Sequence, residues 1–306
     1  MNTNLLTEFK NSLEMRGTAS GTIYNYCSHI ENFIDYLKVE EYSDLDTHTK
    51  VDYYNWVSNL QSMGLKNSTI NNYIRSVTRF ILWGFEDAEV IKKDTFRNTR
   101  FGKGRARFLK QEEKEINYMS NETVQGIFSE ARGRDEEIMF SLMAYSGMRA
   151  EEVTNAKVQD IDILEDVNGK VSYRLNIPKT KSGKSRNIPL PDDFAEAIFE
   201  YVQDRKKKSE YIFIGKRTGK KLSTNAVYDR VKAAAGKVVD EDELATISPH
   251  TFRKTAATNW LMAGNSVESV GNALGHSKGS RQVTFSYTKI LKGFSDEVFS
   301  SQSVAI

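Results

Sequence analysis

The sequence has almost none of the residues that form disulfides and clustered metal sites. One cysteine, Cys27, leaves no partner for an internal disulfide and excludes a cysteine-rich metal site. The four histidines show no metal-ligand spacing with carboxylates or with Cys27. A glycine-rich Walker loop, which would cradle a nucleotide, is also absent. We therefore expect a protein that works without a metal or other cofactor.

Long apolar runs and a strong charge of one sign are missing too. No stretch approaches the roughly 18 apolar residues of a membrane span. The opening MNTNLLTEFKNSLEMRG has neither the basic region nor the long apolar run of a signal peptide. The 43 basic and 41 acidic residues leave a net charge of +2, too little to predict a nucleic-acid partner from the total alone. We expect a soluble protein of the cytoplasm, without contact to a membrane.

Apolar residues recur at helical spacing through residues 1–96. The stripes cover residues 5–13, 23–37, 51–60 and 70–81. Ser20 and Asn67 are candidate N-caps of two of these helices, and Gly17 and Gly64 are candidate stops. Four amphipathic helices with short connections predict a compact helical domain.

Basic residues gather in the stretch RNTRFGKGRARFLK, residues 97–110, which holds six basic residues and no acidic one. The stretch lacks helical or strand periodicity, so we interpret residues 97–115 as an interdomain linker. It is either a solvated loop or a segment lying along a nucleic-acid backbone, where its cations would displace counterions. The same two interpretations hold for later basic residues such as Lys216. The candidate DNA contacts in the linker are Arg97, Arg100, Lys103, Arg105 and Arg107.

Residues 116–306 predict a second domain of helices with a small β-sheet. The segment VSYRLNIPKTKSGKSRNIPL predicts two strands joined by a turn at Ser182 and Gly183, and YIFI predicts a further short strand. Helices are expected from Ser120, over 134–146, 192–206 and 223–235, from Ser248 to about Gly264, and over 266–274. The predicted fold is mainly α with a small sheet, of the α+β class.

Four motifs of the second domain carry residues suited to chemistry on a phosphate. YSGMRAEEV contains Arg149 and Glu152, KTKSGKSRNIPL contains Lys181, SPHTFRKTAAT contains His250 and Arg253, and LGHS contains His276, with Tyr287 eleven positions later. In this order the motifs resemble the tyrosine recombinases, the family of phage integrases, Xer proteins and Cre. The resemblance covers roughly residues 116–290, and residues 1–96 are weakly similar to the family's core-binding domain. It implies a helical core-binding domain followed by an integrase-type catalytic domain, without an arm-binding domain of the phage-lambda type.

The residue types fit that chemistry individually. A guanidinium stays charged and matches phosphate geometry, so Arg149 and Arg253 could hold one phosphate from two sides. His250 and Arg253 are three residues apart, which places them on one helix face in the first turns after Ser248. Free backbone N–H groups and the helix dipole favour an anion there.

The nucleophile and the proton carriers follow from the same reasoning. Tyr287 is the candidate nucleophile, and His250, whose ordinary pKa is near neutral, is the candidate for accepting its proton. Lysine can give up a proton whereas arginine in practice cannot, which makes Lys181 the candidate acid for the departing DNA oxygen. We expect His276 to hydrogen-bond the phosphate and Glu152 to orient a helix or a catalytic neighbour.

The resemblance implies cleavage and rejoining of double-stranded DNA through a 3′-phosphotyrosyl intermediate, by four protomers acting on two specific sites. The alternatives are DNA relaxation of the type IB topoisomerase kind, a catalytically silent DNA-binding protein of the same fold, and a helical interaction module without a DNA role. One departure concerns Tyr287, which lies about two positions later than the commonest family spacing; Phe285 occupies the usual position. The segment 293–306 is expected to dock on a neighbouring subunit.

Overall fold

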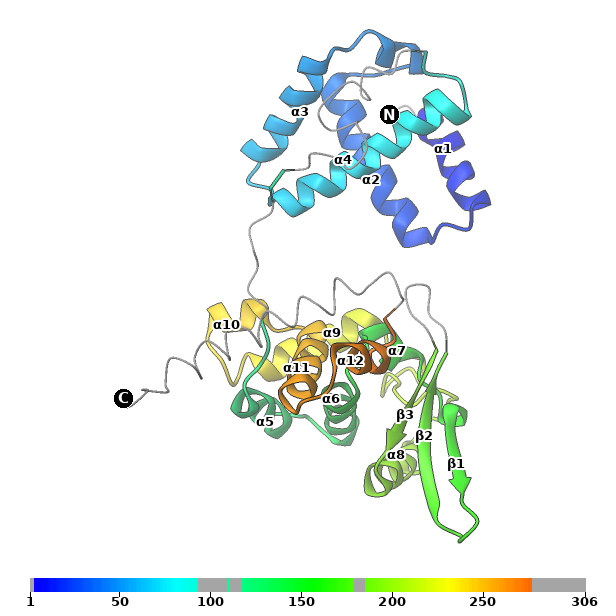
Figure 1. Ribbon diagram of the computed structural model, residues 1–306, viewed down its shortest axis with the longest axis vertical. Helices are drawn as coiled ribbons and strands as arrows, with labels where there is room; N and C mark the ends of the chain where they lie inside the picture. Colours follow the sequence, from blue (N-terminus) through cyan, green and yellow to red (C-terminus); the bar gives the residue numbers. More distant parts are fainter. Residues whose placement is uncertain (1–2, 93–108, 111–116, 179–184, 277–306) are drawn as a thin grey trace, which may run out of the picture. The chain divides into compact units, whose positions relative to one another are not determined.

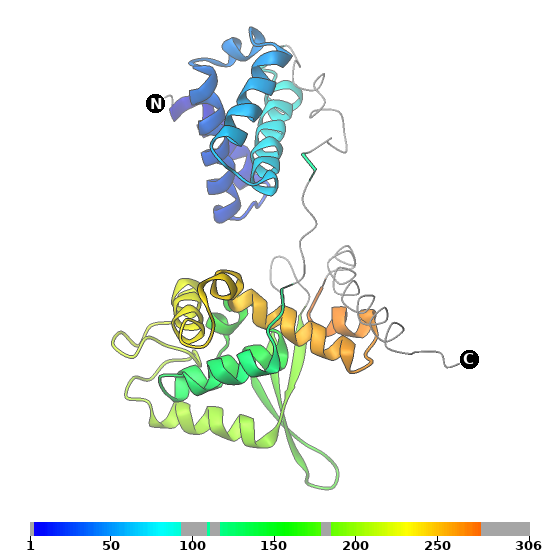
Figure 2. The same ribbon diagram turned by 90° about the vertical axis from the view of Figure 1, so that its left-hand side faces the viewer.

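The computed structural model describes residues 3–92, 109–110, 117–178 and 185–276. The chain divides into two compact units, Met1–Lys114 and Glu115–Ile306 (Figures 1 and 2). Each unit has its own apolar core. Helices dominate both, and the described strands form one small antiparallel sheet, which confirms the predicted fold class. Within the described ranges, none of the helices is long and apolar enough to span a membrane.

The first unit contains the four predicted helices. They are α1 (Thr3–Met15), α2 (Ser20–Leu37), α3 (Lys50–Ser62) and α4 (Asn67–Leu82), with short turns of helix at Tyr42–Asp46 and Trp83–Asp87. Gly17 and Gly64 follow α1 and α3 with φ of +67° and +73°, the left-handed conformation that ends a helix. The two predicted N-caps are wrong by one residue, because Ser20 and Asn67 are the first helical residues and Ala19 and Lys66 precede them.

Asn71 of α4 ties a later part of the chain to this unit. Its Nδ2 donates to the Leu109 carbonyl oxygen and its Oδ1 accepts from the Leu109 N–H, both at 2.9 Å. Asn67 donates to the Lys110 carbonyl oxygen at 2.8 Å. Leu109 and Lys110, within the segment interpreted as a linker, therefore pack on the first unit; residues 93–108 and 111–116 lie outside the described residues.

The second unit consists of helices around one sheet. Its elements are α5 (Asn121–Ser129), α6 (Arg134–Ser146), α7 (Ala150–Asn155), a 3₁₀ turn (Val158–Asp160), β1 (Ile161–Glu165), β2 (Val171–Ile177), β3 (Arg186–Leu190), α8 (Asp192–Asp204), α9 (Thr224–Ala235), α10 (Glu241–Thr246), α11 (Pro249–Met262) and α12 (Val267–Ala273). The apolar helix α6 packs against α11, where the rings of Phe140 and Phe252 stack with centroids 6.1 Å apart. Figure 1 shows these two helices at the centre of the unit and the sheet at its side, next to α8.

The sheet has the order β1-β2-β3, and both pairings are antiparallel. Leu175 of β2 lies opposite Ile161 on one side and Ile188 on the other, and all three are buried. The two predicted strands of the hairpin are confirmed. The expected strand YIFI is wrong: Tyr211 and Ile214 form only isolated bridges, to Lys157 and Lys221.

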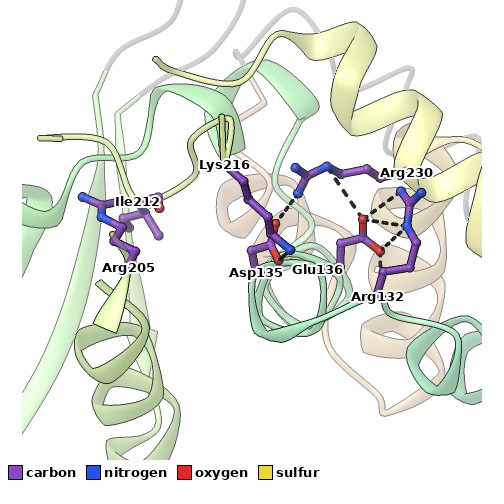
Figure 3. A network of polar contacts seen from close by, with 7 residues as sticks. All are labelled: Arg132, Asp135, Glu136, Arg205, Ile212, Lys216 and Arg230. Carbon is purple, nitrogen blue, oxygen red and sulfur yellow. Dashed lines mark hydrogen bonds and ion pairs between the residues drawn. The ribbon is translucent and has the colours of Figure 1, made fainter. Parts of the chain in front are cut away.

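Two buried carboxylates fix the start of α6, as Figure 3 shows. Asp135 accepts from Lys216 Nζ at 2.9 Å and from Arg230 Nη1 at 2.7 Å. Glu136 pairs with Arg132 at 2.9 Å, and Arg230 Nε lies 3.8 Å from it. Acidic residues in the first turn also suit the helix dipole. Lys216 therefore neutralises a buried carboxylate of its own unit.

Candidate active site

Arg149 lies where one helix ends and the next begins. α6 ends at Gly147, whose φ of +60° is the left-handed conformation, and Arg149 then occupies the N-cap position of α7. Glu152, three residues on, accepts a hydrogen bond from the Arg149 backbone N–H at 2.9 Å and from its Nη1 at 2.8 Å. The spacing of the first motif thus closes the first turn of α7 and orients the Arg149 guanidinium.

A second arginine, which the sequence analysis missed, holds the same carboxylate. Nη1 of Arg186 donates to Glu152 Oε1 at 3.1 Å and Nη2 donates to Oε2 at 2.8 Å. The side chain of Glu152 is 1% exposed and that of Arg186 is 6% exposed, whereas 27% of the Arg149 side chain is exposed. Glu152 therefore lies buried between one buried and one solvent-accessible guanidinium.

The ionisation of Glu152 reflects these partners. Burial alone would raise the pKa of the Glu152 carboxyl, because it penalises the charged form. The hydrogen bonds and charge of Arg186, and then the hydrogen bonds from Arg149, outweigh burial and lower the pKa to about 2. Glu152 is therefore a permanent anion at neutral pH, suited to orienting cations and unsuited to proton transfer.

Arg253 connects the Arg149 and His276 segments from inside the unit. It belongs to α11, which begins at Pro249 after Ser248 as predicted, and it is 1% exposed. Its Nη1 donates to the Gly147 carbonyl oxygen at 2.6 Å, and its Nη2 donates to the Leu274 carbonyl oxygen at 2.5 Å. His250, one turn earlier on α11, is exposed. The expected helix start therefore places Arg253 inward and His250 at the surface.

The two imidazoles lie in a cationic environment. Desolvation, followed by the charges of Arg253, Arg149 and Arg186 and by His250, lowers the pKa of His276 to about 4. Desolvation and the charges of Lys254, Arg253 and Arg149 also lower the pKa of His250 below its ordinary value, although the side chain keeps an exposed edge. Both rings are therefore neutral at pH 7, and each can donate one hydrogen bond and accept another.

The structure thus brings together five cationic or imidazole side chains that we call the arginine–histidine cluster: Arg149, Arg186, His250, Arg253 and His276. Three arginines against the one carboxylate of Glu152, with neutral imidazoles, give a formal charge of +2. A cluster of this kind attracts an anion such as a phosphate. Lys181, Tyr287 and the five linker residues Arg97, Arg100, Lys103, Arg105 and Arg107 lie outside the described residues.

Comparison with known proteins shows the family to which the chain belongs. Residues 97–292 match the model of the phage integrase family, and residues 6–84 match that of the phage integrase N-terminal SAM-like domain. The first match covers more than half of the chain, so the chain belongs to the phage integrase family. Its similar relatives are named tyrosine recombinases, as the motifs predicted.

Two such relatives align along most of their length. Tyrosine recombinase XerA of Pyrococcus horikoshii is 28% identical over 292 residues, which are 95% of this chain and 90% of that protein. Tyrosine recombinase XerC of Bacillus subtilis is 25% identical over 283 residues, with 89% and 86% covered. The predicted membership of the tyrosine recombinases, enzymes that break and rejoin DNA, is confirmed.

Solved structures share the fold. A post-cleavage complex of the XerH site-specific recombinase with a palindromic difH substrate gives a TM-score of 0.70 at 20% identity, covering 95% of this chain and 84% of that one. A lambda integrase dimer bound to a COC′ core site gives 0.68 at 17% identity, covering 92% and 75%. Both align with more than nine tenths of this chain, which confirms the fold expected from the motifs.

Proposed function

We propose that this recombinase cleaves and rejoins double-stranded DNA at specific sites through a 3′-phosphotyrosyl intermediate, with Tyr287 as the nucleophile. The observation that carries the proposal is the arginine–histidine cluster, which brings residues of four separate motifs into one cationic site. Attack on a phosphodiester places negative charge on its non-bridging oxygens, and preorganised donors stabilise that charge.

Each residue of the cluster has a part in this proposal. Arg149, with its partly exposed guanidinium, holds the non-bridging oxygens. Arg253 adds its charge and fixes the segments before Arg149 and His276. His276, neutral at pH 7, donates an N–H to the phosphate.

Proton transfer needs two further groups. The lowered pKa of His250 keeps its ring neutral at pH 7, as a group accepting the Tyr287 proton must be. Lys181, on the segment between β2 and β3, supplies the proton to the departing 5′ oxygen, because lysine can give one up and arginine cannot. The proposed mechanism uses no metal or other cofactor.

The partners follow from the same proposal. Strand exchange requires two DNA sites and four protomers, which assemble on DNA in the cytoplasm. The helical domain 1–96 and the catalytic domain 116–306 both bind the duplex, and the linker 97–115 contacts its backbone through Arg97, Arg100, Lys103, Arg105 and Arg107. Support comes from the solved relatives XerH and lambda integrase, whose structures contain DNA.

The test uses a pool of nicked duplexes with a random central sequence. A nick close to the cleavage position lets the short end leave, so cleavage traps the protein on DNA in a detergent-resistant complex. Sequencing the trapped DNA identifies a substrate, and we expect Tyr287→Phe to bind it while forming no such complex. Tyr228→Phe, which changes an exposed tyrosine of α9, is the matched control and stays active. A detergent-resistant complex formed by Tyr287→Phe would refute the assignment.

A further inference from the structure

Arg186 makes a two-pronged contact with the carboxylate that also holds Arg149. It is the first residue of β3, and its Nη1 and Nη2 donate to separate oxygens of Glu152 at 3.1 and 2.8 Å. This fork-to-fork geometry is the strongest that an arginine and a carboxylate form. Arg149 uses one guanidinium nitrogen, Nη1, for the same carboxylate.

We propose that Arg186 is a positioning residue for DNA strand cleavage: it neutralises Glu152, so that Arg149 is oriented by this carboxylate without being neutralised by it. The inference rests on the proposed function of the cluster. Arg149, Glu152 and Arg186 together carry one net positive charge, which remains available to the scissile phosphate. Arg149 and Glu152 alone would carry none.

The physical reason lies in the burial of Glu152. A carboxylate that is 1% exposed must be compensated by hydrogen bonds and opposite charge. Among the described residues, its hydrogen-bond donors are Arg149 and Arg186. Without Arg186 the whole compensation falls to Arg149, which would be drawn inward and away from an incoming phosphate.

The pair also joins two parts of the catalytic machinery. Glu152 lies in α7, which begins just after Arg149, and Arg186 opens β3, five residues after Lys181 in the chain. The register pairs Arg186 with Ile177 of β2, so the contact is made at the end of the sheet from which the Lys181 segment departs. Arg186 thereby holds the start of β3 against the helix start that carries Arg149.

Cleavage of two substrates separates electrostatic positioning from a general structural role. One is the selected nicked duplex; the other carries a methylphosphonate at the scissile position, where a methyl group replaces a charged oxygen. We expect Arg186→Met to slow cleavage of the phosphodiester about 10- to 100-fold with DNA affinity nearly unchanged. On the methylphosphonate, which is neutral before attack and carries one negative charge fewer during it, the variant and the wild type differ by less than about threefold, because Arg149 has less charge to neutralise.

Three further variants complete the experiment. We expect Arg149→Ala also to slow cleavage of the phosphodiester far more than cleavage of the methylphosphonate. Arg186→Lys keeps the charge but loses the two-pronged contact, so its rate on the phosphodiester should lie between those of the wild type and Arg186→Met. Arg174→Met is the control, since it removes a β2 arginine whose Asp162 ion pair is at the surface, and it stays active on both substrates. Equal loss on both substrates, or a wild-type rate for Arg186→Met, would overturn the proposal. If Arg186→Met does not fold, Arg186→Lys decides by the same comparison.

A measurement without DNA tests the role of Arg186 independently of whether the protein cleaves DNA. In protein labelled with ¹³C at the glutamate side-chain carboxyl, the resonance of Glu152 reports its pKa. We expect that pKa to lie near 2 in the wild type and to rise clearly in Arg186→Met, because the largest favourable partner is gone. An unchanged pKa overturns the role of Arg186 whether or not DNA is cleaved. Wild-type protein that never forms a covalent DNA complex refutes the proposed function alone.

Discussion

Nη2 of Arg253 donates a hydrogen bond of 2.5 Å to the carbonyl oxygen of Leu274, two residues before His276. The neighbouring Nη1 donates to Gly147, two residues before Arg149. One buried guanidinium therefore sets the separation of two motif residues that are far apart in the chain. This arrangement gives Arg253 a structural task in addition to the positive charge that it adds to the site.

Replacement of Arg253 by methionine removes both bonds while filling much of the space. Each carbonyl oxygen that loses its donor in the interior costs about 1–3 kcal/mol, so we expect the free energy of unfolding to fall by about 2–4 kcal/mol. Urea denaturation measures this change. Arg253→Lys keeps the charge but cannot reach both carbonyls at once, and it should lose less stability. An Arg253→Met protein as stable as the wild type would show that the two bonds contribute nothing.

Gly147 approaches the segment before His276 closely. A Cβ on Gly147 would lie 2.8 Å from Leu274 Cδ2, and its φ of +60° disfavours any side chain. We expect Gly147→Ala to lower the free energy of unfolding by about 2–3 kcal/mol, and cleavage to fall with it. Gly64→Ala is the control: φ is +73° there, but a Cβ meets nothing within 4 Å, so only the backbone cost of about 1 kcal/mol applies. An equal loss in the free energy of unfolding for Gly147→Ala and Gly64→Ala would contradict the close contact between Gly147 and Leu274.

The lowered pKa of His276 makes stability depend on pH. The unfolded chain binds the proton near the ordinary value of 6.5 and the folded chain only near 4, so stability is complete above pH 6.5 and falls as the pH drops toward 4. For this half-buried ring we expect a loss of about 1–3 kcal/mol over that window. His276→Gln should lose less over the same range, measured by urea denaturation at pH 7 and pH 4.5. An equal loss of stability between pH 7 and pH 4.5 in the wild type and in His276→Gln would mean that His276 is not desolvated among cations.

The proposed acid, Lys181, is tested by changing the leaving group. A bridging sulfur in place of the 5′ oxygen leaves as a thiolate, which needs no proton because a thiol is far more acidic than an alcohol. We expect Lys181→Ala to slow cleavage of the normal phosphodiester by about 10²–10⁴-fold and to cleave the sulfur substrate at nearly the wild-type rate. Lys184→Ala, in the same hairpin segment, is the matched control. A sulfur substrate that fails to restore the rate would assign Lys181 another role.

Much of the fold could be predicted because its helices are long and amphipathic. The stripes over 23–37 and 70–81 predicted α2 and α4, and Ser248 with Pro249 marked the start of α11. The helices α7 and α10 were missed, because six residues are too few for a helical period to show. β1 was missed because most of its residues are exposed, and YIFI was misjudged because its apolar residues fill the core without a strand partner.

In the site, residues within short motifs could be predicted from the sequence, whereas a contact between distant residues could not. Residues of the short motifs were identifiable, since Arg149 with Glu152 and His250 with Arg253 follow fixed spacings within one helix turn. Arg186 was not, because its partner Glu152 lies 34 residues earlier and meets it only in the folded unit. A signal did exist: the alternation of Arg186, Ile188 and Leu190 places a charged residue on the buried face of a strand, where it requires a buried counterion.

The chemical identity of the protein–DNA link tests the central claim most directly. A complex trapped on the selected nicked duplex, digested with nuclease and protease, yields a peptide carrying a nucleotide, whose position fragmentation mass spectrometry determines. We predict a nucleotide joined through its 3′ phosphate to the oxygen of Tyr287. A nucleotide on any other residue, or one joined through a 5′ phosphate, would contradict the mechanism.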